Sequence, residues 1–242
     1  MNTVLKPKVL LFTVVLCLIA LMGNACAFQD RGIKGNGNVV TQTRAVSGFT
    51  KLSVSSAFKV FIKQGSATEL KVEAEENLMD HIITKVEGST LRIYCNGVSA
   101  TKNMTIHLSF VNLDEIKLSG AVTIEGASAL KFEKLYLDFS GASEANLDLT
   151  AIELDGNASG ATKLRLAGSI GKADFDLSGA SELEAKGLAV KTMELEASGA
   201  SSAEVDVAEQ LNISASGASD VTYSGAAQVQ SKSSGASNIR KR

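Results

Sequence analysis

The sequence predicts an all-β protein, a right-handed β-helix or solenoid with coils of about 19 residues and an atypical N-terminal capping region. The first observation is the tripeptide Ser-Gly-Ala, of which seven copies recur at a nearly constant spacing between residues 119 and 236. Steps of 18 to 21 residues separate its glycines, which are Gly120, Gly141, Gly160, Gly179, Gly199, Gly217 and Gly235. A fixed period near twenty indicates stacked units that bury their apolar faces only against their neighbours.

The second observation is an alternation of apolar and polar residues around each glycine. Positions two, four and six before the glycine are mostly apolar, as are positions four and six after it. Examples are Leu135, Leu137 and Phe139, Leu211, Ile213 and Ala215, and Leu164 and Leu166. A period of two predicts strands with one face toward a core and the other toward water.

The composition is the third observation. The chain has 21 Gly, 9 Phe, 3 Tyr and no Trp, so Leu, Ile, Val and Ala must fill the core. Its one proline, Pro7, precedes the predicted strands, which therefore keep all their backbone donors. A β-sandwich of regularly spaced hairpins is the alternative, but a sandwich does not require the same tripeptide at every turn.

Each predicted coil has two short strands and two turns. The glycine of Ser-Gly-Ala marks the first turn, where the chain needs a residue that tolerates positive φ or close backbone approach. A second turn is expected roughly eight residues later, at Gly126, Gly168, Gly187 and Gly225. Successive coils then stack about 4.8 Å apart, with hydrogen bonds running between them.

Residues 1–27 read as a signal peptide. Lys6 and Lys8 precede an apolar run over residues 9–22, which is short for a membrane span of about 20 residues. Ala25-Cys26-Ala27 then offers a cleavage site, and Cys26 leaves open a lipidated N-terminus, which is the only membrane attachment we expect. Either reading predicts an exported protein of the periplasm, the outer-membrane surface or the extracellular space.

The rest of the chain is predicted to form one domain that follows a short N-terminal segment. Residues 28–38, with Gly35-Asn36-Gly37-Asn38, are predicted to be a flexible N-terminal segment. A single β-helix domain follows over residues 39–240, with irregular first coils at 39–111 and regular Ser-Gly-Ala coils at 112–240. Between residues 75 and 86 the alternation lapses, and Asn77 is expected to cap a short helical turn.

Charge and motifs exclude several functional classes. Removal of residues 1–27 takes Lys6 and Lys8 from the 24 basic residues and none of the 26 acidic ones, which moves the net charge from −2 to −4. Nucleic acid is therefore not an expected partner. Only Cys95 remains after cleavage, so no internal disulfide is expected, and His81 and His107 have no partner at metal-ligand spacing. We find none of the common nucleophile, zinc or nucleotide motifs.

Acidic residues recur at two positions before the corner glycine, and they are the candidate site. In an in-register β-helix, Asp155, Asp174 and Glu194 form one outward column, while Asp176 and Glu196 belong to its neighbour. Like charges opposite one another are destabilising, but only by about 1 kcal/mol or less when exposed, so a merely solvated face is one interpretation. The other is that these five residues gather a hard cation, Ca²⁺, whose oxygen ligands come from neighbouring coils and water. No other cofactor is expected.

The order of short motifs resembles a known family. Gly-Asn-Gly is followed by Val-Ser-Gly-Phe-Thr-Lys-Leu at 46–52, Val-Phe-Ile-Lys-Gln-Gly at 60–65, Leu-Lys-Val-Glu-Ala at 70–74 and Gly-Ser-Thr-Leu-Arg-Ile at 88–93, and then by the Ser-Gly-Ala coils. This order resembles the putative auto-transporter adhesins with a head GIN domain of Gram-negative bacteria, over residues 38 to 240. The resemblance implies a secreted or envelope β-helix with an adhesive role, and it brings no catalytic residues.

The function predicted from the sequence is a non-catalytic binding or adhesion module that presents a regular β-helix face. Its partner would be an unknown glycan, a matrix component or another envelope or extracellular protein. A structural protein of the cell envelope without a specific ligand is the alternative. A carbohydrate-active enzyme is a further one, but it would need clustered carboxylates in a groove walled by long loops, and the regular coils vary by only three residues in length.

Overall fold

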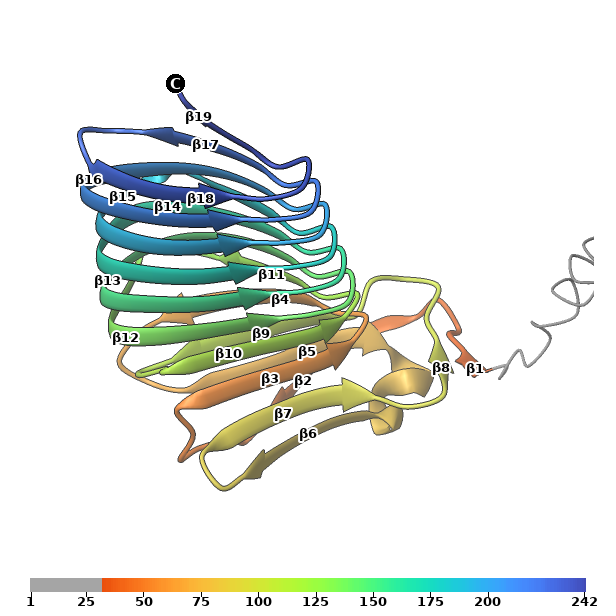
Figure 1. Cartoon of the computed structure of the whole chain (residues 1–242). Helices are drawn as coiled ribbons and strands as arrows, with labels where there is room; N and C mark the ends of the chain where they lie inside the picture. The colour runs from red at the N-terminus through yellow and green to blue at the C-terminus, as the bar shows by residue number, and fades with distance from the viewer. Residues whose placement is uncertain (1–31) are drawn as a thin grey trace, which may run out of the picture.

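The computed structural model describes residues 32–242, so the predicted signal peptide, Cys26 and residues 28–31 lie outside the described residues. The chain is a β-solenoid with an irregular N-terminal end (Figure 1). Across residues 32–242 we find no helical segment with the length and hydropathy of a membrane span.

The first elements are β1 (Ile33–Lys34), β2 (Val39–Arg44), β3 (Lys51–Ser56), β4 (Lys59–Gln64), β5 (Glu69–Glu75), the 3-10 helix η1 (Glu76–His81), β6 (Ile82–Glu87), β7 (Thr90–Cys95), β8 (Val98–Ser99) and β9 (Thr105–Phe110). The stacked coils comprise β10 (Glu115–Gly120), β11 (Thr123–Gly126), β12 (Leu130–Phe139), β13 (Glu144–Ala158), β14 (Lys163–Leu177), β15 (Glu182–Ala197), β16 (Ser202–Ala215), β17 (Asp220–Ser224), β18 (Gln228–Ser233) and β19 (Asn238–Lys241).

The predicted alternation is confirmed in the regular coils, where every ladder between coils is parallel. Strand β13 shows the pattern clearly, because buried and non-buried residues alternate along most of its length. Leu154, Ala173, Met193 and Leu211 pair in order across four coils, and all four are buried. A single apolar core therefore runs along the solenoid.

The corner glycines stack directly on one another. From Gly120 to Gly235 their φ angles lie between 73° and 89°, a conformation that L side chains rarely adopt. A Cβ on Gly179 would lie 2.7 Å from the carbonyl oxygen of Gly160 in the coil below. That oxygen accepts a hydrogen bond from the Ala180 N–H at 2.7 Å, and the same bond repeats along the corner column. The corners therefore form a backbone ladder with no space for a side chain.

A serine two residues after the glycine completes most corners. Ser181 is buried, and its Oγ donates a hydrogen bond to the Ser178 carbonyl at 2.6 Å. The equivalent bond forms at residues 143, 201, 219 and 237. A small side chain at this position therefore leaves room in the core and also satisfies a carbonyl that the turn would otherwise leave without a partner.

The second turn matches our expectation at Gly126 and Gly225, where β11 and β17 end, but differs from it in the four long coils. Strands β13 to β16 run through it as continuous strands of 14 to 16 residues, so it is a bend within a ladder and not a separate turn. Of the four glycines predicted there, Gly168 and Gly225 have positive φ, whereas Gly126 and Gly187 do not. The ladders shift register at this bend, between Arg165 and Ala167 for example. Differences in coil length are absorbed here, which keeps the residues before the corner aligned.

The first coils stack in an order that differs from the chain order. Strand β10 pairs with β3, and β11 pairs with β4, so the coil built from residues 51–64 lies directly beneath the first regular coil. On the other side of that coil lie β7 and β9, which pair with β3 and β4. The antiparallel pairs β2–β5, β5–β9 and β6–β7 add further strands at this end (Figure 1).

The predicted helical turn is present as η1, but Asn77 does not cap it. No side chain caps the N-terminus of η1, and Ile82 already belongs to β6. The Asn77 side chain instead reaches the N-terminal segment, where it accepts from the Asn36 N–H at 3.0 Å and donates to the Lys34 carbonyl at 2.8 Å. These two bonds use the side chain that we assigned to the cap.

The segment predicted to be flexible has fixed partners over residues 33–38. Strand β1 pairs with β8, and the buried Glu75 carboxylate accepts hydrogen bonds from the Gly37 N–H at 2.7 Å and the Thr101 N–H at 2.7 Å. The Thr101 hydroxyl and the Lys102 N–H also donate to Glu75. These bonds, with the Thr101 hydroxyl bond first, lower the pKa of Glu75 to about 2. Gly35 also allows the chain to pass close to this buried charge, because a Cβ there would overlap the Glu75 carboxylate.

Candidate functional site

The five predicted acidic residues lie in register on the stretch of each coil that leads into the corner. Asp155 pairs with Asp174 and Asp174 with Glu194, while Asp176 pairs with Glu196 in the next column. We call the surface formed by these five residues the acidic face. Because strands in a ladder lie about 4.8 Å apart, it presents a regular array of carboxylates.

Four of these carboxylates have no cationic partner in the part of the chain that the structure describes. Over residues 32–242, no Lys or Arg nitrogen lies within 4.0 Å of the side-chain oxygens of Asp174, Asp176, Glu194 or Glu196. Asp155, the fifth, is 3.5 Å from Lys134 Nζ. The acidic face thus retains repulsion that its own coils do not neutralise.

The stretch that leaves the corner is built differently. Lys163 Nζ lies 2.8 Å from Glu182 and 2.7 Å from Glu184. Arg165 pairs with Glu184 at 2.9 Å and also with Glu144. We call this surface, residues 144, 163, 165, 182 and 184, the paired face. Cross-coil charges alternate in sign there, whereas on the acidic face they do not.

The Asp174 carboxyl of the acidic face has a raised pKa. Partial burial raises the pKa of its carboxyl, and the neighbouring charges of Glu194, Asp176 and Asp155 raise it further. Lys172 opposes them with a smaller effect. The direction means that the charged form of Asp174 is disfavoured in the fold, as expected for stacked like charges.

The carboxylates do not converge on a point. Over residues 32–242, no group of three or more Asp, Glu, His or Cys side chains is placed to hold a metal ion. The structure thus brings the five predicted residues onto one face but does not gather them into a coordination shell. Calcium at this face stays a prediction, and binding would require side chains from adjacent columns to turn toward one another.

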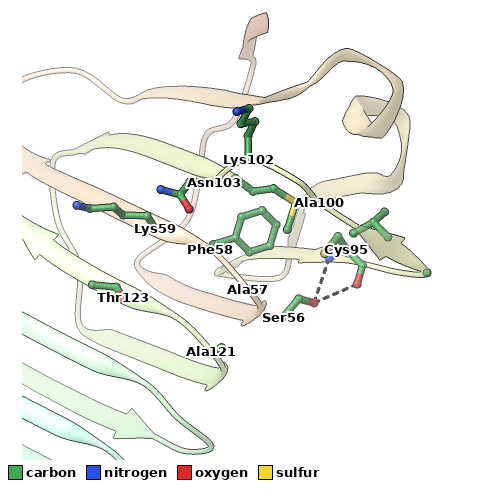
Figure 2. A pocket seen from close by; sticks show the side chains of 13 residues that line it. Ser56, Ala57, Phe58, Lys59, Cys95, Ala100, Lys102, Asn103, Ala121 and Thr123 are labelled. Carbon is green, nitrogen blue, oxygen red and sulfur yellow. Dashed lines mark hydrogen bonds between the residues drawn. The ribbon is translucent and has the colours of Figure 1, made fainter. Parts of the chain in front are cut away.

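A hollow of about 620 Å³ lies where the corner column meets the irregular coils (Figure 2). Ser56, Ala57 and Phe58 line it from the turn between β3 and β4, and the loop after Cys95 lines it from the other side. Ser56 Oγ donates to the Cys95 carbonyl at 3.0 Å and accepts from the Cys95 N–H at 3.3 Å. Lys59 and Lys102 also line the hollow, and neither side chain points toward the Phe58 ring in Figure 2.

Ser56 occupies the corner position that glycine holds in later coils. It pairs with Gly120, and its φ of 85° is the only positive value at a non-glycine residue among those described. A side chain fits here because residues 96–104, which include the short strand β8, do not form another tight corner beneath it. The hollow is the space that the missing corner leaves.

The family comparison agrees with this architecture. The family described as putative auto-transporter adhesin, head GIN domain, matches residues 48–227, which is well over half of the chain. The chain belongs to this family. Among curated proteins, none is similar enough to the chain to count as a relative.

Solved structures share the fold of this head GIN domain. A crystal structure of a putative adhesin from Bacteroides fragilis matches with a TM-score of 0.83 and 20% identity, covering 87% of this chain and 100% of that one. A putative adhesin from Parabacteroides merdae has a TM-score of 0.68 and 22% identity, with coverage of 87% and 98%. A protein from Parabacteroides distasonis described as a putative lipid binding protein has a TM-score of 0.71 and 21% identity, with coverage of 87% and 99%. At these identities the likeness shows the fold alone.

Sequence reasoning missed the hollow of this head GIN domain. Our expectation that no loop walls a groove was drawn from the regular coils, whereas this hollow lies among the irregular ones. Two signals could have located it: the first corner carries Ser56 in place of glycine, and Gly97 to Asn103 interrupt the alternation before Thr105.

Proposed function

We propose that this head GIN domain is an exported, non-catalytic binding module that adheres to a glycan, matrix or envelope partner through its acidic face. One observation carries the proposal: among residues 32–242, four in-register carboxylates have no Lys or Arg nitrogen within 4.0 Å, while every acid of the paired face has one. Membership of an adhesin family supports the adhesive reading.

The physical argument is one of complementarity. Like charges stacked across strands cost stability, and the paired face demonstrates that this solenoid can place Lys and Arg opposite Glu. A partner with positive charge, or Ca²⁺ shared between the partner and Asp155, Asp174, Asp176, Glu194 and Glu196, would relieve the repulsion on contact. The ladder fixes the spacing of the carboxylates before the partner arrives, so little order needs to be gained on binding.

The test compares two variants that remove the same number of charges. The first replaces each unpaired acid by its amide: Asp174→Asn, Asp176→Asn, Glu194→Gln and Glu196→Gln. The control replaces four exposed acids elsewhere: Glu69→Gln, Asp148→Asn, Glu204→Gln and Glu209→Gln. Binding is measured by interferometry on surfaces coated with laminin, fibronectin or collagen, with and without calcium.

We expect wild type and the control to be retained on at least one surface, and the acidic-face variant to be released. Retention should weaken as salt rises from about 0.05 M to about 0.3 M, because exposed charges are screened over a shorter distance. Equal retention of the two variants would refute the acidic face as the contact surface. Absence of retention on every surface would favour the alternative, a structural envelope protein without a ligand.

A further inference from the structure

A second hollow, of about 830 Å³, lies beside the N-terminal half of strand β12 and belongs neither to the acidic face nor to the corner column. Its lining includes Phe132, Tyr136, Asn112, Asp114 and Gln64. We call it the Phe132 hollow. Its volume falls within the range of about 300 to 1,000 Å³ that small-molecule sites occupy.

Phe132 forms an aromatic platform in this hollow. The ring stacks against the fully buried Phe110 ring, with centroids 6.3 Å apart and planes 12° from parallel. Phe132 pairs with Ala151, and the residues above it in the same column, Ile170 and Val190, are buried. Phe132 is only partly buried, because it ends this column at the open side of the first long coil.

Gln64 holds the platform in place. Its Oε1 accepts from the Lys131 N–H at 2.8 Å, and its Nε2 donates to the Lys131 carbonyl at 2.9 Å and to the Val111 carbonyl at 3.3 Å. A side-chain amide therefore supplies both bonds that a neighbouring strand would give to β12 at this point. The clamp fixes the backbone next to Phe132, so the ring is oriented before any ligand arrives.

The charges around the Phe132 hollow balance. Its lining includes three basic side chains and three acidic ones, which are Lys51, Lys131, Lys134, Asp114, Glu115 and Glu133. Lys51 is paired with Glu115 at 2.8 Å, and Lys134 with Glu153 at 3.0 Å. The side chains of Asn112 and Asp114 are exposed and offer an amide and a carboxylate to a ligand. A neutral ligand that both donates and accepts hydrogen bonds suits this lining better than an anion or a cation.

From these observations we infer that the Phe132 hollow binds a neutral oligosaccharide of two or three sugar rings. The apolar face of one ring would stack on Phe132, and hydroxyls of the sugars would bond to Asn112 and Asp114. This inference rests on the proposed binding function and gives it a second contact surface. The hollow of Figure 2 suits such a ligand less well. Phe58 is only 3% exposed, and Lys59 forms an ion pair with Glu125 at 3.1 Å.

The test uses saturation-transfer NMR on the purified protein with lactose, maltotriose, cellotriose and tri-N-acetylchitotriose as neutral probes. Trigalacturonate serves as the acidic probe. The variants are Phe132→Leu, which keeps an apolar side chain over Phe110 but removes the ring face, and Asp114→Asn, which keeps the shape of an exposed side chain. Asp148→Asn, an exposed acid that lies neither in the hollow nor on the acidic face, is the control, and circular dichroism checks that all variants melt near the wild-type temperature.

We expect at least one neutral probe to show saturation transfer, and each of the two hollow variants to weaken its binding by about fivefold to tenfold. The Asp148→Asn control should bind like wild type. No transfer to any neutral probe, preference for trigalacturonate, or unchanged binding by Phe132→Leu would overturn the inference. The proposed function fails separately, since retention on coated surfaces depends on the acidic face and not on Phe132.

Discussion

The corner column provides the sharpest test of the fold, and Gly179 lies near its middle. Its φ is 73°, and a Cβ there would lie 2.7 Å from the Gly160 carbonyl oxygen and 3.0 Å from the Gly160 nitrogen. Both contacts are with backbone, so no side chain can turn away to relieve them. A Cβ on Gly199 would lie equally close to the Gly179 carbonyl oxygen, so a shift of the Gly179 backbone would disturb the next coil.

Two costs add at this position. Placing an L residue in the left-handed region costs about 1 to 2 kcal/mol, and overpacking against fixed neighbours costs about 1 to 3 kcal/mol. Gly179→Ala should therefore lose about 2 kcal/mol, and Gly179→Val about 3 kcal/mol or more, because a β-branched side chain is poorly tolerated at positive φ. For a chain of this size, each kcal/mol lowers the melting temperature by about 2 to 4 °C.

Gly187 is the matched control in the same coil. Its φ is not positive, and a Cβ there would meet the nearest atom, Ala167 Cβ, at an ordinary 3.6 Å. Gly187→Ala should change stability by no more than about 0.5 kcal/mol. Thermal melts and urea titrations followed by circular dichroism measure all three variants. If Gly179→Ala melted with wild type, or no lower than Gly187→Ala, the stacked-corner argument would be refuted.

Three further predictions concern charge. Glu75→Gln should lower the melting temperature at neutral pH more than Glu76→Gln does, because the folded pKa of Glu75 is about 2, below its usual 4.5. The difference in melting temperature between the two variants should shrink as the pH falls from 4.5 to about 2. A difference that does not change with pH would contradict this prediction. Asp174→Asn should raise stability at neutral pH by at most about 1 kcal/mol, because the raised pKa means that the charged carboxyl destabilises the fold. In acid melts the gain should disappear as the pH falls below 3.8, the ordinary pKa of an aspartate, and a gain that persists there would contradict the prediction. Millimolar calcium should raise the wild-type melting temperature in calorimetry, and Asp174→Asn with Asp176→Asn should abolish the rise; no shift in wild type would leave the acidic face without a bound cation.

The acidic face was predictable because two simple regularities coincide. Side chains alternate with a period of two, and the coils repeat at nearly constant length, so Asp155, Asp174 and Glu194 had to share a column once the chain formed a solenoid. The one-residue difference between coils did not disturb this alignment, since the bend near Ala167 absorbs it. Pairing of the charges was not predictable, because it depends on which long side chains reach across a coil, as Lys163 does.

The hollows were not predictable, since each arises where one coil fails to cover another. Ser56 looks like an ordinary strand residue until β10 is seen to pair with β3. Gln64 and Lys131 are 67 residues apart, and nothing in their local sequences connects them. Contacts of this kind depend on the order in which coils stack, and apolar alternation is the same whichever coil lies beneath.

By itself, the sequence determined the repeating part of this protein: the strands, the glycine corners, the buried faces and the acidic columns. These follow from local rules, because a residue that needs positive φ or an inward position carries that requirement in its own chemistry. The tertiary structure alone decided that residues 51–64 lie beneath the first regular coil, that Glu75 fixes the N-terminal segment and that two hollows open among the first coils. Those features depend on pairings between segments far apart in the chain, whose free energies are set by packing and hydrogen bonding that no local pattern records.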